Sequence, residues 1–199
     1  MPVCRAHYDM RSNDDFFRLL LRYTAGEDVL GEITAAIAAR PDIVYLAWGP
    51  TRPEHDTIPR ELWIWCFRQA GYVPDGPVLL YRGCAHYARF GMSWTADVRI
   101  AELFSRMDHA GGPQAWNVYA HRAEPCEVLA RSYVHSSEHK IFPAHITQMP
   151  LTWDEYVVDP AYLTDENVVA YAIHPGDYSN MVSECARLGR PIDFKIKQP

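Results

Sequence analysis

The sequence lacks several features that mark whole classes of protein. It contains no run of about 18 consecutive apolar residues, which argues against a membrane-spanning helix. Its first residues, MPVCRAHYDMRSNDD, lack the apolar core of a secretory signal peptide. It also has no internal repeat, no low-complexity tract and no linker long enough to divide the chain. We therefore expect one domain over residues 1–199 that does not enter a membrane.

Paired cysteines are also missing. The odd number of cysteines and the absence of any CxxC pair argue against a disulfide framework and against a standard zinc ribbon. We expect reduced thiols in a cytoplasmic compartment, mostly acting as small buried apolar residues. The five cysteines are Cys4, Cys66, Cys84, Cys126 and Cys185.

A strong excess of one charge is absent as well. The net charge is −6, with 22% charged and 48% hydrophobic residues, which is ordinary for a globular domain. The mild acidity argues against broad electrostatic binding to nucleic acid, although a local basic groove stays possible.

The first third of the chain predicts helices. Ser12 or Asn13 is the expected cap of the first, whose apolar residues Phe16, Leu19, Leu20 and Tyr23 recur at helical spacing. The second covers residues 28–40, and the third begins near Pro59 and ends at Gly71. The apolar stretch IVYLAW, residues 43–48, is either a strand or a continuation of the chain into the core.

The remainder predicts mainly strands, and thus the α+β class. We expect strands at PVLLYRG (77–83) and GMSWT (91–95), then a helix within 96–107. A meander of consecutive strands is expected at 115–123, 126–134 and 139–146. A helix or loop should follow TWDEY (152–156), and a last strand should cover VVAYAI (168–173).

The stretch VHSSEHK, residues 134–140, contains His135, Glu138 and His139 in the order of a zinc-peptidase helix. On a helix the two histidines would share one face, with the glutamate as the base. A third ligand would come from Glu155, Glu166, Asp177 or Glu184, but none lies in a second recognisable motif. Tyr133, Val134 and the tandem serines favour a strand or turn, so a zinc-dependent hydrolase is the alternative reading.

A second set of residues is spread over three motifs. Arg82 ends the expected strand LYRG, Ser93 and Thr95 lie in GMSWT, and Glu138 follows later. With these motifs, residues 77–145 resemble the mono-ADP-ribosyltransferases of the Arg–Ser–Glu class, particularly small phage and bacterial members with YRG and SWT motifs. The resemblance implies an ADP-ribosyltransferase-like fold of two packed β-sheets with N-terminal helices. It divides the domain into a mainly helical part (1–75), an NAD-binding catalytic core (76–145) and a completing segment (146–199).

The resemblance also implies a reaction and residue roles. NAD, as substrate, loses nicotinamide through an oxocarbenium-like transition state, and no metal takes part. Glu138 would stabilise the ribose cation, Arg82 would bind the pyrophosphate, and Gly83 would let the backbone approach the ligand. Ser93 and Thr95 would orient the glutamate and the ribose. An aromatic residue would stack on nicotinamide, and the candidates for the NAD site are Tyr81, Phe90, Trp94 and Phe104.

The acceptor of ADP-ribose is expected to be a macromolecule, either protein or nucleic acid. Many family members have Glu or Gln two residues before the catalytic glutamate, where it helps to select the acceptor. Here that position is Ser136, which disfavours transfer to arginine. The family suggests a toxin, phage–host or defence role in a bacterial or phage-infected cell, with an antitoxin as a further partner. A non-catalytic binding module with the same fold is the third reading.

Overall fold

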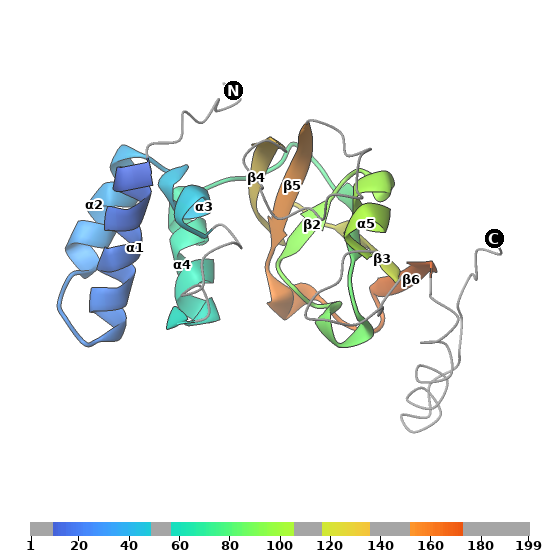
Figure 1. Ribbon diagram of the computed structural model, residues 1–199, viewed down its shortest axis with the longest axis horizontal. Coiled ribbons are helices and arrows are strands. Elements are labelled where there is room, and N and C mark those ends of the chain that lie inside the picture. Colours follow the sequence, from blue (N-terminus) through green and yellow to red (C-terminus); the bar gives the residue numbers. More distant parts are fainter. Residues whose placement is uncertain (1–9, 49–56, 106–116, 136–151, 173–199) are drawn as a thin grey trace, which may run out of the picture. The chain divides into compact units, whose positions relative to one another are not determined.

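The computed structural model describes residues 10–48, 57–105, 117–135 and 152–172 (Figure 1). The chain forms two compact units, Met1–Val73 and Pro74–Pro199, which we call the helical unit and the sheet unit. The boundary lies where the sequence changes from helical to strand-like patterns. Whether the two units form a single domain stays a prediction.

The helical unit has four described helices: α1 (Met10–Thr24), α2 (Leu30–Ala39), α3 (Ile43–Trp48) and α4 (Arg60–Ala70). Gly71 ends α4 with a left-handed backbone (φ 71°), as the sequence predicts for a C-cap. Apolar side chains on the inner faces of these helices form its core, among them Phe16, Leu20, Ile33, Ile37, Val44, Trp63 and Phe67.

Two sequence predictions for this unit need correction. The stretch IVYLAW forms helix α3 rather than a strand, and its residues Val44 and Ala47 are fully buried. Helix α1 begins at Met10, so Asn13 lies inside the helix, where it is fully buried and cannot act as the cap.

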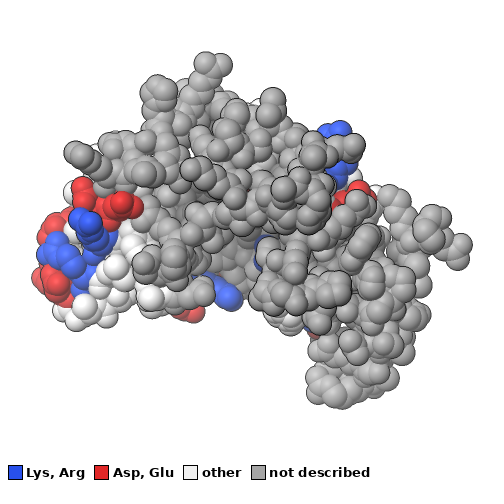
Figure 2. Space-filling model, in the orientation of Figure 1, with Lys and Arg blue, Asp and Glu red and all other residues white. Residues whose placement is uncertain are grey.

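The outer faces of α1 and α2 carry charges of both signs, as the left end of Figure 2 shows. Arg22 Nε donates to Glu27 Oε2 at 2.7 Å, and its Nη1 lies 3.5 Å from Glu32 Oε2. These exposed pairs contribute little to stability, but they balance the charge of this surface locally.

The sheet unit contains six described strands in one antiparallel sheet, in the order β4-β5-β2-β1-β3-β6. The strands are β1 (Val78–Gly83), β2 (Ser93–Thr95), β3 (Val118–Ala123), β4 (Val128–His135), β5 (Thr152–Val158) and β6 (Val168–Ala172). The mixed α+β class is therefore confirmed. Among the described residues we find one sheet and not the two expected from the resemblance.

The strand order corrects the expected meander. β3 pairs with β1 and β6, whereas β4 pairs with β5, so β3 and β4 are not neighbours although they follow each other in the chain. The stretch TWDEYVV, of which TWDEY had no expected element, forms strand β5 between β4 and β2, and a short helical turn at Pro160–Tyr162 follows it. The strand expected at 139–146 lies outside the described residues.

Helix α5 (Val98–Ser105) packs against the sheet beside β1. Gly83, at the end of β1, makes this approach possible because a Cβ there would overlap the backbone oxygen of Ala101 and the backbone nitrogen of Ser105. Gly83 is therefore needed for the packing of α5, and its expected role in letting the backbone approach a ligand stays a prediction.

Gly83→Ala is expected to destabilise the sheet unit by about 1–3 kcal/mol, because backbone atoms of α5 must move to admit the methyl group. Gly76→Ala is the matched control, since a Cβ at Gly76 has no atom within 4 Å. Urea unfolding of the two variants checks this. Equal midpoints would contradict the close packing of β1 against α5.

Candidate active site

The central feature of the sheet unit is a buried carboxylate next to a serine. Thr95 on β2 pairs with Glu155 on β5, and Ser93 pairs with Val157. Because side chains alternate along strands, Ser93, Thr95 and Glu155 lie on the same face of the sheet. Ser93 Oγ donates to Glu155 Oε1 at 2.5 Å, and Glu155 is only 7% exposed. The sheet thus holds one glutamate in a fixed, largely dry position.

Arg82, on the neighbouring strand β1, contacts the backbone beside this pair. Because Tyr81 pairs with Thr95, the side chain of Arg82 leaves the sheet on the face opposite Ser93 Oγ and Glu155, and it meets Ser93 at its backbone oxygen. Its Nε donates to the backbone oxygen of Ala88 at 3.0 Å, and its Nη1 donates to the backbone oxygen of Ser93. The guanidinium lies against Gly91, where a Cβ would overlap Arg82 Nη2. The cation is therefore positioned before any ligand binds, and Gly91 provides the space for it.

A second cation, Arg89, lies near Arg82. Its Nη2 forms an ion pair with Asp165 at 2.8 Å, its Nη1 donates to the backbone oxygen of His86, and its guanidinium lies 4.3 Å from the centre of the Phe90 ring. The Phe90 ring is thus covered by Arg89, which leaves less of it for stacking on a ligand.

The Cys84 thiol lies beside these two cations. Burial raises its pKa, and the charges of Arg82 and Arg89 only partly offset this. Burial likewise raises the pKa of Cys66 to about 12. Both thiols therefore stay protonated near neutral pH and are poor nucleophiles. Of the five cysteines, the three that the structure describes, Cys66, Cys84 and Cys126, are free.

A cavity of about 530 Å³ is lined by residues that adjoin Thr95 and Glu155 in the chain, while Ser93 and Glu155 themselves are not part of its lining. Trp153 and Asp154, which line it, directly precede Glu155, and Ala96 directly follows Thr95. Three aromatic residues contribute to its wall, and a volume of this size suits a small organic ligand. The lining residues are Tyr81, Ala96, Asp97, Val98, Tyr133, Trp153 and Asp154.

Two carboxylates of this cavity are held by arginines. The side chain of Arg99 hydrogen-bonds Asp97 at 2.6 Å and lowers the pKa of that carboxyl, and Arg131 pairs with Asp154 at 2.9 Å. The negative charge of both acids is therefore largely compensated by the arginines. The cavity favours a planar ligand with little net charge more than a free cation.

The remaining residues expected to bind NAD take different positions. Tyr81 lines the cavity and packs edge-on against Tyr171, with ring centroids 5.4 Å apart. Trp94 is 2% exposed and points to the opposite face of β2, so it does not face Ser93 and Glu155.

The other two expected residues have packing or capping contacts. Phe104 packs against Trp153 in a hydrophobic cluster, with ring centroids 6.1 Å apart. Thr95 accepts a hydrogen bond from the backbone N–H of Asp97 and thereby helps to begin α5.

Glu138 and Ser136, the expected catalytic and acceptor-recognition residues, lie outside the described residues, as does His139. His135 is the last residue of strand β4, so a helix presenting His135 together with His139 does not begin there. Among the described residues, no group of three His, Cys, Asp or Glu side chains is arranged to hold a metal ion.

Glu155 is the functional candidate that the sequence prediction missed. A weak signal was available: of the two acids in TWDEYVV, Glu155 alone occupies the alternate positions shared with the apolar Trp153 and Val157. Without the strand assignment, Glu155 was considered only as a third zinc ligand.

Comparison of the chain with protein-family models finds no match, and neither curated proteins nor solved structures match it. Within the segments that the structure describes, no helix has the length and apolarity needed to cross a membrane.

Proposed function

We propose that this chain cleaves NAD at the nicotinamide–ribose bond and transfers ADP-ribose to a macromolecular acceptor, or to water when none is present. One observation carries the proposal. Arg82, Ser93 and Glu155, from three strands adjacent in the sheet, form one connected set of hydrogen bonds. In this proposal Glu155 takes the role that the sequence resemblance gave to Glu138.

The geometry of Glu155 suits the chemistry of this bond. Loss of nicotinamide leaves positive charge on the ribose, as in glycoside hydrolysis, and a fixed carboxylate stabilises that charge. A buried carboxylate acts more strongly than an exposed one because little water screens it. The hydrogen bond from Ser93 Oγ fixes the direction in which Glu155 points.

Arg82 suits the pyrophosphate of NAD. A guanidinium is always charged and presents several N–H donors in a plane, which matches phosphate oxygens. Its contacts with the backbone oxygens of Ala88 and Ser93 use only part of this donor set. In this proposal the remaining donors, which lie beside Gly91 and Cys84, turn to a phosphate, and Arg89 adds a second positive charge near Cys84.

The cavity beside Glu155 supports the proposal with space for a planar ring. The aromatic side chains of Tyr81, Tyr133 and Trp153 line it, and such walls favour stacking of nicotinamide or of a ring from the acceptor. We further propose that the six-stranded sheet belongs to an ADP-ribosyltransferase-like fold, because the strand with Ser93 lies between the strands with Arg82 and Glu155.

If Glu155 is the catalytic residue, a different residue stands at the position that helps to select the acceptor. The position two residues earlier is then Trp153, which is 5% exposed and packs against Ile100. A buried tryptophan has no carboxylate to accept a proton from an arginine side chain, so we propose an acceptor other than arginine. A role in toxin–antitoxin conflict, phage attack or defence fits this activity.

Incubation of the purified chain with NAD labelled in the adenylate part, with and without a bacterial lysate, tests the function. We expect nicotinamide release in both samples and labelled macromolecules in the lysate. Separate protease and nuclease digestions then report the acceptor class. Failure to cleave or bind NAD, together with no metal in the purified protein, would favour a non-catalytic binding module, whereas stoichiometric zinc that is lost in His135→Ala would favour the zinc-dependent hydrolase.

A further inference from the structure

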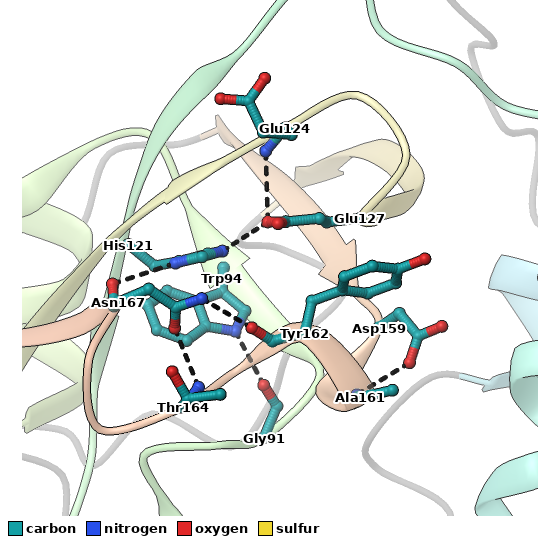
Figure 3. Close-up of polar contacts among 10 residues, drawn as sticks. All are labelled: Gly91, Trp94, His121, Glu124, Glu127, Asp159, Ala161, Tyr162, Thr164 and Asn167. Atoms are coloured by element: carbon teal, nitrogen blue, oxygen red, sulfur yellow. Dashed lines mark hydrogen bonds and ion pairs between the residues drawn. The ribbon is translucent and has the colours of Figure 1, made fainter.

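A buried polar cluster lies on the face of β2 opposite Ser93 and Glu155 (Figure 3). Its centre is His121, which is 2% exposed. His121 Nε2 lies 2.7 Å from Glu127 Oε2, and His121 Nδ1 lies 3.1 Å from the backbone oxygen of Asn167. The NAD chemistry proposed above uses none of these groups.

Both ring nitrogens of His121 are held by neighbours. A backbone oxygen can only accept a hydrogen bond, so Nδ1 donates to Asn167. Nε2 faces Glu127 Oε2, and this oxygen also accepts the backbone N–H of Glu124 at 3.2 Å. His121 and Glu127 therefore form a buried, oriented pair.

This pair is connected to the candidate active site through Trp94. The rings of Trp94 and His121 lie 5.9 Å apart at an interplanar angle of 57°, which is within the range of direct ring–ring contact. On its other side, Trp94 Nε1 donates to the backbone oxygen of Gly91 at 2.7 Å. Figure 3 shows the indole between the His121 ring and this backbone oxygen.

Gly91 completes the connection because it packs directly on the guanidinium of Arg82. We infer that the His121–Glu127 pair is a positioning device that holds Trp94, and through Trp94 holds Gly91 and Arg82 in the geometry that binds the pyrophosphate of NAD. The inference rests on the proposed function for its ligand but on the described contacts for the positioning itself.

A purely structural role would give a different pattern of effects. If the pair only fills the core, its loss lowers the stability of the fold but does not change how strongly Arg82 binds NAD. A positioning role instead changes the environment of the Trp94 indole and the affinity for NAD together. These two quantities can be measured separately.

The test uses Glu127→Gln, which keeps the size of the side chain but removes its charge. The amide makes a weaker contact with His121 Nε2 than the carboxylate does, so His121 should hold Trp94 less firmly. We expect the Trp94 indole N–H resonance in a ¹⁵N-tryptophan spectrum, assigned with Trp94→Phe, to shift. We also expect NAD to bind about tenfold more weakly by calorimetry, the loss of roughly one hydrogen bond.

Asn167→Ala is the matched control in the same cluster. It removes two side-chain hydrogen bonds, from Thr164 N–H at 2.9 Å and to the Tyr162 oxygen at 2.7 Å, but keeps the backbone oxygen that faces His121. This variant should unfold at a lower urea concentration without a change in the Trp94 resonance or in NAD affinity.

The outcomes separate the inference from the proposed function. An unchanged Trp94 resonance and NAD affinity in Glu127→Gln, or equal weakening of NAD binding in Asn167→Ala, would overturn the positioning role. If the wild-type chain binds no NAD, the proposed function fails. In that case the Trp94 resonance alone tests whether His121 and Glu127 position Trp94. A shift of this resonance in Glu127→Gln supports the positioning role, and an unchanged resonance overturns it.

Discussion

Glu155→Gln is expected to lower the rate of nicotinamide release from NAD by about a hundredfold to a thousandfold while the chain stays folded. The amide keeps the shape of the side chain and can still accept the hydrogen bond from Ser93 Oγ. It lacks the negative charge that stabilises the ribose cation. Because the side chain is buried, no nearby water replaces that charge.

Asp154→Asn is the matched control for this variant. Asp154 precedes Glu155 on β5, but its carboxylate pairs with Arg131 in a partly exposed ion pair. We expect less than a threefold change in the rate, because such pairs contribute little. Circular dichroism and urea unfolding would confirm that both variants are folded. An equal loss of activity in Asp154→Asn would show that charge on β5 in general matters and not Glu155 in particular.

Arg82→Lys is expected to weaken NAD binding about tenfold to a hundredfold, with most of the loss in affinity and a smaller loss in the rate at saturating NAD. The guanidinium contacts two backbone oxygens, of Ala88 and Ser93, and keeps further donors for a phosphate. An ammonium is a point charge and cannot make this planar arrangement. Losing a hydrogen bond to a charged group costs about 1.5–3 kcal/mol, which corresponds to this range of affinity.

Arg131→Lys provides the comparison for this substitution. Arg131 also makes a two-pronged contact with a carboxylate, that of Asp154, but its side chain is 48% exposed. Calorimetry with NAD should give the wild-type affinity for this variant. If both lysine variants bind NAD as the wild type does, Arg82 is not the pyrophosphate ligand.

Local patterns in the sequence predicted much of the sheet unit. The strand at PVLLYRG, the short strand at SWT and the helix after it all occur, because turn residues separate them and their apolar spacing is clear. Strand β6 at VVAYA was predicted for the same reason. These elements carry Arg82 and Ser93, and the structure places the two residues in direct contact.

Two elements lacked a usable pattern. In α3, apolar residues cover several sides, and Val44 and Ala47 are fully buried, so no helical periodicity is visible. In β5, buried residues occur on both faces, with Glu155 and Tyr156 adjacent and both less than a tenth exposed. The alternation of polar and apolar residues that marks a surface strand is therefore absent there.

The pairing of the strands could not be read from the sequence either. β4 and β5 are neighbours, and β5 pairs with β2 although about sixty residues separate them, as the Ser93–Glu155 contact shows. Pairing between strands that are far apart in the sequence depends on how their buried side chains pack together. A single sequence does not show that packing. The resemblance therefore points to Glu138, whereas the sheet brings Glu155 next to Ser93.

Nicotinamide release from NAD by the wild type, Glu155→Gln and Glu138→Gln, measured side by side at equal concentrations of folded protein, tests the central claim most directly. The Arg82–Ser93–Glu155 site predicts cleavage by the wild type and by Glu138→Gln, with almost none by Glu155→Gln. Full cleavage by Glu155→Gln together with loss in Glu138→Gln would contradict it, as would a wild-type chain that leaves NAD intact.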